Sequence, residues 1–259
     1  MRLLFKIVKT PIDFILTFIF WFYFIFGYLL FYVPLLFLLK PFIRDTEAMF
    51  QKTNHIFYLV FFTLMKIITP GLTIKISKEV SSVQSAVVIS NHRSYLDPIL
   101  LISIFPRQKT IVKGIFFKFP VLRWVMKSGG YIPFVPDGEF KYMMIEGIQS
   151  MSAFLKKGGV LFIFPEGRRS RDGKLGKFQK GAFSIAGKCN VPVELIYIHN
   201  TSRLFTPGKF FFNTCIRNTI TVERLGTIMP EHETNMGARD LRDKAFQMYG
   251  QRMKEDGTA

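Results

Sequence analysis

Residues 85–105 read SAVVISNHRSYLDPILLISIF. The first part, Ser85–Ser90, is short, apolar and rich in β-branched side chains, which is typical of a buried strand. The apolar run Pro98–Phe105 has the length of a short helix, and proline fits the first helical position. Because Pro98 also biases Asp97 away from helical backbone, we expect Asp97 to cap this helix. A buried strand that leads into a helix is the repeating unit of an α/β fold.

The same alternation continues on both sides of this stretch. Short β-branched runs alternate with longer amphipathic runs from Pro70-Gly71 onward, which predicts a mainly parallel central sheet flanked by helices. We therefore assign an α/β domain to residues 71–259. The other predicted strands are Leu72–Ser77, Lys109–Lys113, Gly130–Val135, Gly159–Phe164, Pro192–Ile198 and Thr219–Arg224, and the other predicted helices are Val121–Lys127, Glu139–Lys157, Phe178–Lys188 and Gly237–Glu255.

Residues 1–70 have a different character. The 26 residues Phe14–Leu39 carry no charge, and as a helix they would be about 39 Å long against a hydrocarbon core of about 30 Å. This run could span a bilayer with tilt, or break near Gly27–Pro34 into two halves too short to cross. Basic residues on both sides would suit a re-entrant hairpin. The shorter run Ile56–Thr69 predicts an interfacial or core helix. We predict an N-terminal membrane-associated helical segment over residues 1–70.

The overall composition limits the possible classes of protein. Of 259 residues, 49% are hydrophobic and 30 are phenylalanine, which excludes an intrinsically disordered chain. The formal net charge is +17, and such a basic, apolar chain favours an anionic membrane surface over nucleic acid as partner. The two cysteines, Cys189 and Cys215, lack redox or metal-ligand spacing, so a disulfide scaffold is excluded and a reducing cytoplasmic setting fits.

Polar residues with catalytic potential follow the strand Ser85–Ser90. A turn between His92 and Asp97 can return the carboxylate to the imidazole, and a histidine oriented by an aspartate can act as a general base. On these two residues alone, the simpler interpretation is that Asp97 only caps the helix and His92 is an ordinary loop residue. Their position at a strand's carboxyl end favours a site, because ligands of open α/β sheets gather there.

Two further segments predict anion binding. The strand Gly159–Phe164 leads into Glu166-Gly167, and three arginines, Arg168, Arg169 and Arg171, follow within four residues. Glycine allows the backbone to approach a ligand, and arginine matches phosphate oxygens with two parallel hydrogen bonds. Lys180 precedes Gly181 near the start of a predicted helix, where backbone amides favour a phosphate. Solvated surface charges are the alternative interpretation of both segments.

In combination, these segments resemble the glycerolipid acyltransferases, the lysophosphatidate acyltransferase family. His92 and Asp97 match its His-x4-Asp motif, and Phe164–Ser170 resembles its Phe-Pro-Glu-Gly-Thr-Arg-Ser motif with Arg168 in place of threonine. Lys180-Gly181 and Val191-Pro192-Val193 resemble later blocks of the family. Residues 130–136 resemble an intervening block, with Pro136 where arginine is common. The resemblance covers about residues 70–225.

The resemblance implies acyl transfer from a thioester, on coenzyme A or acyl carrier protein, to a lysophospholipid hydroxyl, with lysophosphatidate as acceptor and phosphatidate as product. By position, His92 is the base and Asp97 its orienting partner. The acceptor's phosphate would lie with Glu166, Gly167, Arg168 and Arg169, together with Lys180. The family implies no metal, no other cofactor and no covalent acyl-enzyme. It also implies a two-helix element embedded in one leaflet, and we expect the inner, cytoplasmic membrane with the catalytic domain on its cytoplasmic face.

Other interpretations remain open at this point. The acceptor could be another lyso-lipid such as a lyso-aminolipid, or the protein could be a non-catalytic binder of anionic lipid. A covalent route through Cys189 is disfavoured because no histidine lies near it in the sequence. His55, His199 and His232 lack sequence partners that would suggest metal ligation.

Overall fold

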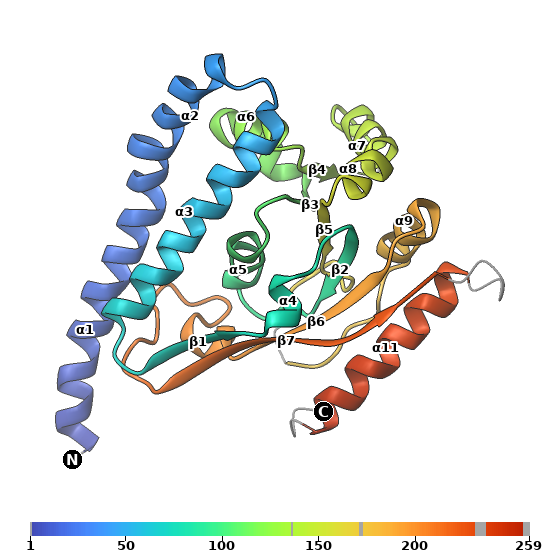
Figure 1. Ribbon diagram of the computed structural model, residues 1–259. Helices are drawn as coiled ribbons and strands as arrows, with labels where there is room; N and C mark the ends of the chain where they lie inside the picture. The colour runs from blue at the N-terminus through green and yellow to red at the C-terminus, as the bar shows by residue number, and fades with distance from the viewer. Residues whose placement is uncertain (1, 136, 171–172, 231–236, 256–259) are drawn as a thin grey trace.

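The computed structural model describes residues 2–135, 137–170, 173–230 and 237–255 (Figure 1). Seven strands form one sheet in the order β1-β7-β6-β2-β5-β3-β4, and every neighbouring pair is parallel except β6 and β7. The predicted mainly parallel sheet is therefore confirmed. The strands are β1 (Leu72–Ile76), β2 (Ala86–Ser90), β3 (Gln108–Lys113), β4 (Ile132–Phe134), β5 (Val160–Ile163), β6 (Val193–His199) and β7 (Asn218–Ile228).

Helices cover both faces of this sheet, as predicted for an α/β domain. In Figure 1, α1 to α3 and α5 lie on one side of the strands, and α9 and α11 lie on the other. The helices are α1 (Arg2–Phe22), η1 (Tyr23–Tyr32), α2 (Val33–Leu39), η2 (Lys40–Phe42), α3 (Thr46–Ile68), α4 (Lys78–Ser81), α5 (Leu96–Ile104), η3 (Gly114–Lys118), α6 (Pro120–Ser128), α7 (Lys141–Gln149), α8 (Met151–Lys156), α9 (Gly181–Cys189), α10 (Thr201–Leu204) and α11 (Ala238–Glu255).

Strand β2 shows how the sheet separates two apolar cores. Successive side chains of a strand point to opposite faces, and Val87 and Ile89 pack into the core beneath α8, α9 and α11. Val88 packs into the other core, together with residues of α1, α3 and α5. All three valine and isoleucine side chains are fully buried. A continuous apolar strand is therefore required at this position, because both of its faces are covered.

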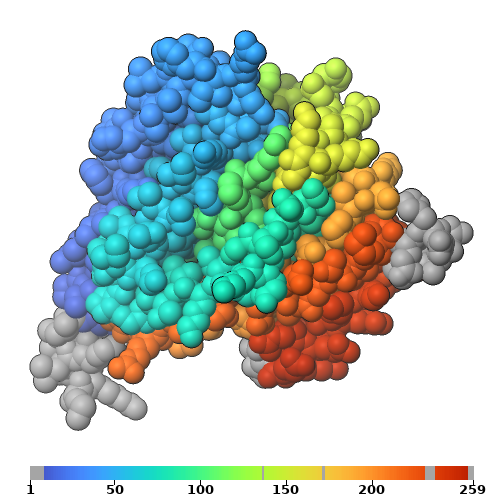
Figure 2. All heavy atoms as spheres, viewed as in Figure 1, coloured from blue at the N-terminus to red at the C-terminus, as the bar shows by residue number. Residues whose placement is uncertain are grey.

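The N-terminal segment forms a helical hairpin. The first arm runs without a break through α1, η1 and α2, so the break near Gly27–Pro34 that we considered does not occur. Where we expected a possible break, the ten residues Tyr23–Tyr32 form a π-helix, which is wider than an α-helix and continues the same arm. The chain reverses at Lys40–Asp45, and α3 returns alongside the first arm. Figure 2 shows the hairpin along one side of the molecule.

The hairpin and the α/β domain share one apolar core. Phe20 of α1 contacts Phe61 of α3 and also Phe212, which lies between α10 and β7. Helix α3 packs on α5, where the ring nitrogen Nδ1 of His55 lies 3.1 Å from the Ile102 carbonyl oxygen. The helix that follows Asp97 therefore rests directly on the hairpin.

Most predicted bounds shift slightly in the structure, and two predicted elements differ more. The single helix expected over Glu139–Lys157 divides at Ser150 into α7 and α8. Only the second part is well buried, with Met151 and Leu155 inside the core. Strand β7 extends to Ile228, four residues beyond the predicted end, because it pairs in antiparallel fashion along the whole of β6. Cross-strand pairing of this kind has no local sequence signal.

Candidate active site

The segment after β2 is fixed to the neighbouring strand by Asn91. The amide of Asn91 donates to the Ile198 carbonyl and accepts from the Ile198 N–H, both at 2.8 Å. The side chain thus extends the pairing of β2 with β6 by one residue, although the backbone has already left the strand. His92 is consequently held at the carboxyl end of the sheet, where the sequence places it.

Asp97 and His92 form a close pair. His92 Nδ1 lies 3.0 Å from Asp97 Oδ2, and the carboxylate is almost fully buried. Three further donors reach it, namely the N–H groups of Arg93 at 2.6 Å and Ser94 at 2.7 Å, and the Thr201 hydroxyl at 2.6 Å. With its oxygens occupied as acceptors, the carboxylate orients Nδ1 as a donor and leaves Nε2 with a free lone pair.

The expected helix cap at Asp97 is wrong. Helix α5 begins at Leu96, one residue before Asp97. The carboxylate turns back to accept from the N–H groups of Arg93 and Ser94, which precede the helix, and not from the first turn that follows it. The aspartate therefore closes the His92 turn, and this arrangement brings it onto the imidazole.

The loop after β5 packs against the histidine. The Phe164 ring stacks on the His92 ring with centroids 4.3 Å apart. The Ser170 N–H donates to the His92 carbonyl at 2.8 Å. The two motifs, about seventy positions apart in sequence, are thus joined at the imidazole ring and at the backbone of His92, because β2 and β5 are parallel neighbours.

Glu166 lies inside this loop. Its carboxylate accepts from the Gly176 N–H at 2.9 Å. Burial raises the pKa of the Glu166 carboxyl, and hydrogen bonds from the Gly176 and His92 backbones offset this only in part. Gly167 has a φ of +67°, a left-handed conformation that L side chains rarely adopt. Glycine is required there for the turn that carries Glu166 inward.

The basic residues of the predicted phosphate site differ in their surroundings. The Arg169 guanidinium carbon lies 3.6 Å from the centroid of the Tyr95 ring, and its buried Nε has no hydrogen-bond partner among the described residues. Arg168 and Lys180 are exposed. Gln179 N–H donates to the Pro165 carbonyl at 2.7 Å, which ties the residue before Lys180 to the same loop. The assigned roles of Glu166, Gly167, Arg168, Arg169 and Lys180 stay predictions.

Two residues of this arrangement escaped sequence reasoning. Thr201 donates to Asp97 from 104 positions away, and Tyr95 supports Arg169. Threonine and tyrosine are common throughout the chain, so no local pattern distinguishes these two. Phe164 was recognised as the first residue of the Phe164–Ser170 motif, but its contact with the imidazole was not foreseen, because that contact depends on the pairing of β2 with β5.

Other candidate groups lie elsewhere. Cys189 ends α9 and packs at the edge of the second core, on the face opposite α5, where burial raises the pKa of its thiol and disfavours the reactive thiolate. His199 Nε2 pairs with Glu223 at 2.8 Å. Across the described ranges, no group of three or more His, Cys, Asp or Glu side chains could hold a metal. Pro136, Arg171 and His232 lie outside the described residues.

The domain that carries this site matches a family model described as Acyltransferase, over residues 72–198. The match begins at β1, ends within β6 and includes both motifs. Residues 72–198 form a domain of the acyltransferase family. The family predicted from the two motifs is thereby confirmed.

Several relatives of this acyltransferase have curated names. A 1-acyl-sn-glycerol-3-phosphate acyltransferase from Brassica napus, described as chloroplastic, is 39% identical over 133 residues, which cover 50% of this chain and 37% of the relative. A 1-acyl-sn-glycerol-3-phosphate acyltransferase from Saccharomyces cerevisiae is 30% identical over 202 residues, covering 76% of this chain and 65% of the relative. The matches thus span between about a third and two thirds of these relatives' length.

A solved structure supports the fold of the acyltransferase. The 1-acyl-sn-glycerophosphate acyltransferase PlsC from Thermotoga maritima superposes with a TM-score of 0.71. The superposition covers 95% of this chain and 97% of that chain at 22% sequence identity. The likeness extends over both the hairpin and the sheet, and it confirms the fold class predicted from the alternation of strands and helices.

Proposed function

We propose that the protein transfers a fatty acyl group from a thioester to the free hydroxyl of lysophosphatidate and so produces phosphatidate for phospholipid synthesis. The observation that carries the proposal is the His92–Asp97 pair, 3.0 Å apart, held against an arginine-bearing loop at the carboxyl end of β2 and β5. A base beside a phosphate-binding group is what acylation of a lysophospholipid requires. The names of the relatives support the same acceptor.

The proposed reaction proceeds by direct transfer. Nε2 of His92 takes the proton of the acceptor hydroxyl while the hydroxyl oxygen attacks the thioester carbonyl carbon. The tetrahedral intermediate then collapses, the carbon–sulfur bond breaks, and the leaving thiolate receives the proton from the imidazolium. Asp97 holds the tautomer and the ring orientation that this transfer needs, and it stabilises the imidazolium while it exists. These steps use no metal and no cofactor besides the acyl donor.

Arg169 is the proposed centre of acceptor binding. Its guanidinium has five N–H donors in a planar fork, and the Tyr95 ring beneath it fixes the plane of the fork. The lysophosphatidate phosphate would accept from this fork, with Arg168 and Lys180 adding positive charge and Gly167 permitting close approach of the backbone. A phosphate fixed here places the hydroxyl within reach of His92.

The hairpin supports a membrane location for this reaction. The helical stretch Lys9–Phe42 is long and apolar enough to cross a membrane. Few residues in its most apolar part are buried inside the protein. Its outward side chains include Phe22, Leu30, Phe31 and Leu38, all at least 60% exposed. An exposed apolar surface of this extent marks a contact with lipid or protein. We propose that it inserts into the inner, cytoplasmic membrane, with the catalytic domain on the cytoplasmic face beside its lipid acceptor.

A panel of acceptors tests the function. Purified protein in mixed micelles is given one acyl-coenzyme A and, in separate reactions, lysophosphatidate, a lyso-aminolipid and a phosphate-free monoacylglycerol. We expect kcat/KM to be highest for lysophosphatidate. Preference for the lyso-aminolipid would reassign the acceptor, and binding of anionic lipid without turnover on any acceptor would identify a non-catalytic lipid binder.

Flotation with vesicles tests the membrane contact. A variant with Phe22, Phe31 and Leu38 changed to Ser removes three exposed side chains and leaves the buried contacts of the hairpin intact. We expect this variant to bind anionic vesicles only at low salt, since the basic surface alone is screened over about 10 Å at 0.1 M salt. Salt-resistant binding equal to that of the unchanged protein would contradict insertion of this surface.

A further inference from the structure

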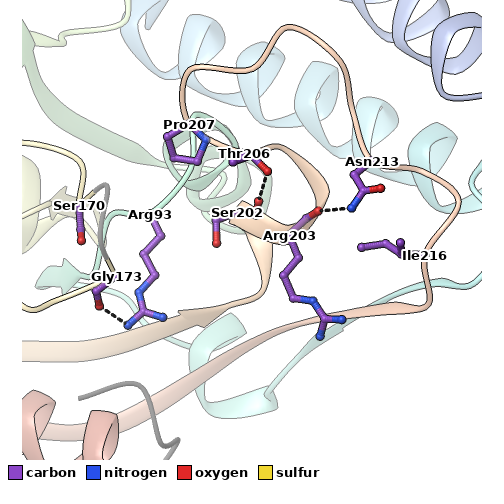
Figure 3. A pocket seen from close by; sticks show the side chains of 9 residues that line it. All are labelled: Arg93, Ser170, Gly173, Ser202, Arg203, Thr206, Pro207, Asn213 and Ile216. Carbon is purple, nitrogen blue, oxygen red and sulfur yellow. Dashed lines mark hydrogen bonds between the residues drawn. The ribbon is translucent and has the colours of Figure 1, made fainter. Parts of the chain in front are cut away.

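A cavity lies beside the turn that carries His92, with Arg93 in its lining. It has a volume of about 520 Å³ and opens to solvent (Figure 3). Its lining comes from the loop after β2, the loop after β5 and the segment from α10 to β7. The polar and charged lining residues are Arg93, Ser170, Ser202, Arg203, Thr206 and Asn213.

Three of the lining residues are linked to the catalytic pair. Arg93 directly follows His92, and the Ser170 N–H donates to the His92 carbonyl. Ser202 directly follows Thr201, whose hydroxyl donates to Asp97. None of the five residues predicted to bind the acceptor is among those that line the cavity. A ligand here would therefore lie next to the His92 turn and would contact the loop after β5 at Ser170 and Gly173, but not at the residues predicted to bind the acceptor.

The lining has the chemistry of a site for a phosphate attached to a polar chain. Two arginines contribute charge, and no acidic side chain is among the described lining residues. The Arg93 guanidinium is anchored, since its NH2 group donates to the Gly173 carbonyl at 2.9 Å. Figure 3 shows the Arg93 and Arg203 side chains extending in the same direction, with Ser202 between them. Hydroxyl and amide groups of Ser170, Ser202, Thr206 and Asn213 share the lining with the apolar Pro207 and Ile216, a mixture that suits a chain of amides and methylene groups.

We propose that this cavity binds the phosphopantetheine arm of the acyl donor. The proposal rests on the proposed function, which requires a thioester beside His92. Coenzyme A and acyl carrier protein share this arm, which joins a phosphate through two amides to the sulfur. Arg203 and Arg93 bind the phosphate, the hydroxyls and the Asn213 amide pair with the arm's amides, and the thioester lies at the His92 end. The donor and the acceptor thus approach the base through separate sets of residues.

Substitution of Arg203 tests the proposal. Arg203→Ala and Arg203→Gln are assayed with the same acyl group on coenzyme A, on acyl carrier protein and on N-acetylcysteamine, which retains the thioester and one amide but has no phosphate. We expect KM to rise about ten- to a hundred-fold for both phosphate-bearing donors, because charge-assisted hydrogen bonds are lost. KM for lysophosphatidate and the rate with the N-acetylcysteamine thioester should stay within about twofold of the unchanged enzyme.

Lys209→Ala is the matched control. Lys209 is an exposed cation on the same segment, and it does not line the cavity. Its removal lowers the net charge by the same amount, so we expect less than a twofold change with any donor. An equally large effect of Lys209→Ala would mean that general surface charge, and not the cavity, attracts the donor.

Three results would overturn the proposal. A rise in KM for lysophosphatidate alone would make the cavity the acceptor site. An equal loss with the N-acetylcysteamine thioester would mean that Arg203 has a structural role. A loss confined to one carrier would mean that Arg203 contacts that carrier beyond the shared arm. In each case the unchanged enzyme remains active, whereas failure of the proposed function would appear as its inactivity with every donor and acceptor.

Discussion

The His92–Asp97 turn and the Phe164–Ser170 loop both follow buried parallel strands, yet their polar groups are satisfied in different ways. Asp97 receives the imidazole, two backbone N–H groups and the Thr201 hydroxyl, all from the protein itself. Arg169 instead rests on the Tyr95 ring, and within the part of the chain that the structure describes its buried Nε has no hydrogen-bond partner. The turn is complete within the chain, whereas the loop retains donors for an anion.

This difference separates two tasks of the site. A base must have its tautomer and orientation fixed before the reaction, because reorganisation during the reaction would add to the barrier. A binding group must keep its hydrogen-bonding capacity for the ligand. We therefore expect substitutions in the turn to lower kcat, and substitutions in the loop to act mainly on KM for the phosphate-bearing acceptor.

The largest expected effect follows from His92→Ala. Removal of the base should lower kcat at least a hundred-fold, since general-base catalysis contributes roughly 10²–10⁴-fold. Fold and vesicle binding should be unchanged, as checked by circular dichroism and flotation. His55→Gln is the control, because His55 lies on α3, where its Nδ1 is 3.1 Å from the Ile102 carbonyl oxygen. Substantial turnover by purified His92→Ala enzyme would refute the mechanism.

The next effect follows from Asp97→Asn. The amide keeps the shape of the carboxylate, but it can no longer accept from all four donors, so the imidazole loses its fixed orientation. We expect kcat to fall at least about tenfold with little change in KM for lysophosphatidate. Thr201→Val should lower kcat by less than Asp97→Asn does, because it removes only one of the four donors to the carboxylate. If the main effect of both changes were on KM, the turn would not be a purely catalytic element.

Arg169→Ala tests the other side of the comparison. We expect KM for lysophosphatidate to rise about ten- to a hundred-fold, because charge-assisted hydrogen bonds to the phosphate are lost. A smaller fall in kcat should accompany it, since a misplaced phosphate also misplaces the hydroxyl. Arg169→Lys should recover little, because an ammonium lacks the planar fork. An equal loss on a phosphate-free acceptor would mean that Arg169 supports the fold or the donor.

The smallest effect concerns stability at Glu166. Burial raises the pKa of this carboxyl, so the folded state favours the protonated form. The associated stabilisation is present below the carboxyl's ordinary pKa and is lost as the pH rises through the raised value. Glu166→Gln should therefore increase the free energy of unfolding, relative to the unchanged protein, more at about pH 7 than at about pH 4. Denaturant unfolding of both proteins at the two pH values measures these free energies. The prediction would be contradicted if Glu166→Gln changed the free energy of unfolding by the same amount at both pH values.

The sequence alone was sufficient for the fold class and for both motifs. Buried parallel strands such as Ser85–Ser90 must be apolar on both faces, so they stand out as short continuous runs. The order and spacing of His92, Asp97 and the Phe164–Ser170 loop indicated an acyltransferase, and the family match agrees. The long uncharged run near the N-terminus was equally plain, because length and polarity are properties of a segment by itself.

The tertiary structure alone decided which distant residues complete the site. Thr201 reaches Asp97, and Phe164 covers His92, because β6 and β5 lie on either side of β2. The Asp97 carboxylate accepts from the preceding turn, and its additional contact with Thr201 comes from the segment after β6. The sequence records which residues each strand carries, but the order of strands in a sheet is set by the packing of both its faces, and that packing is a property of the whole chain.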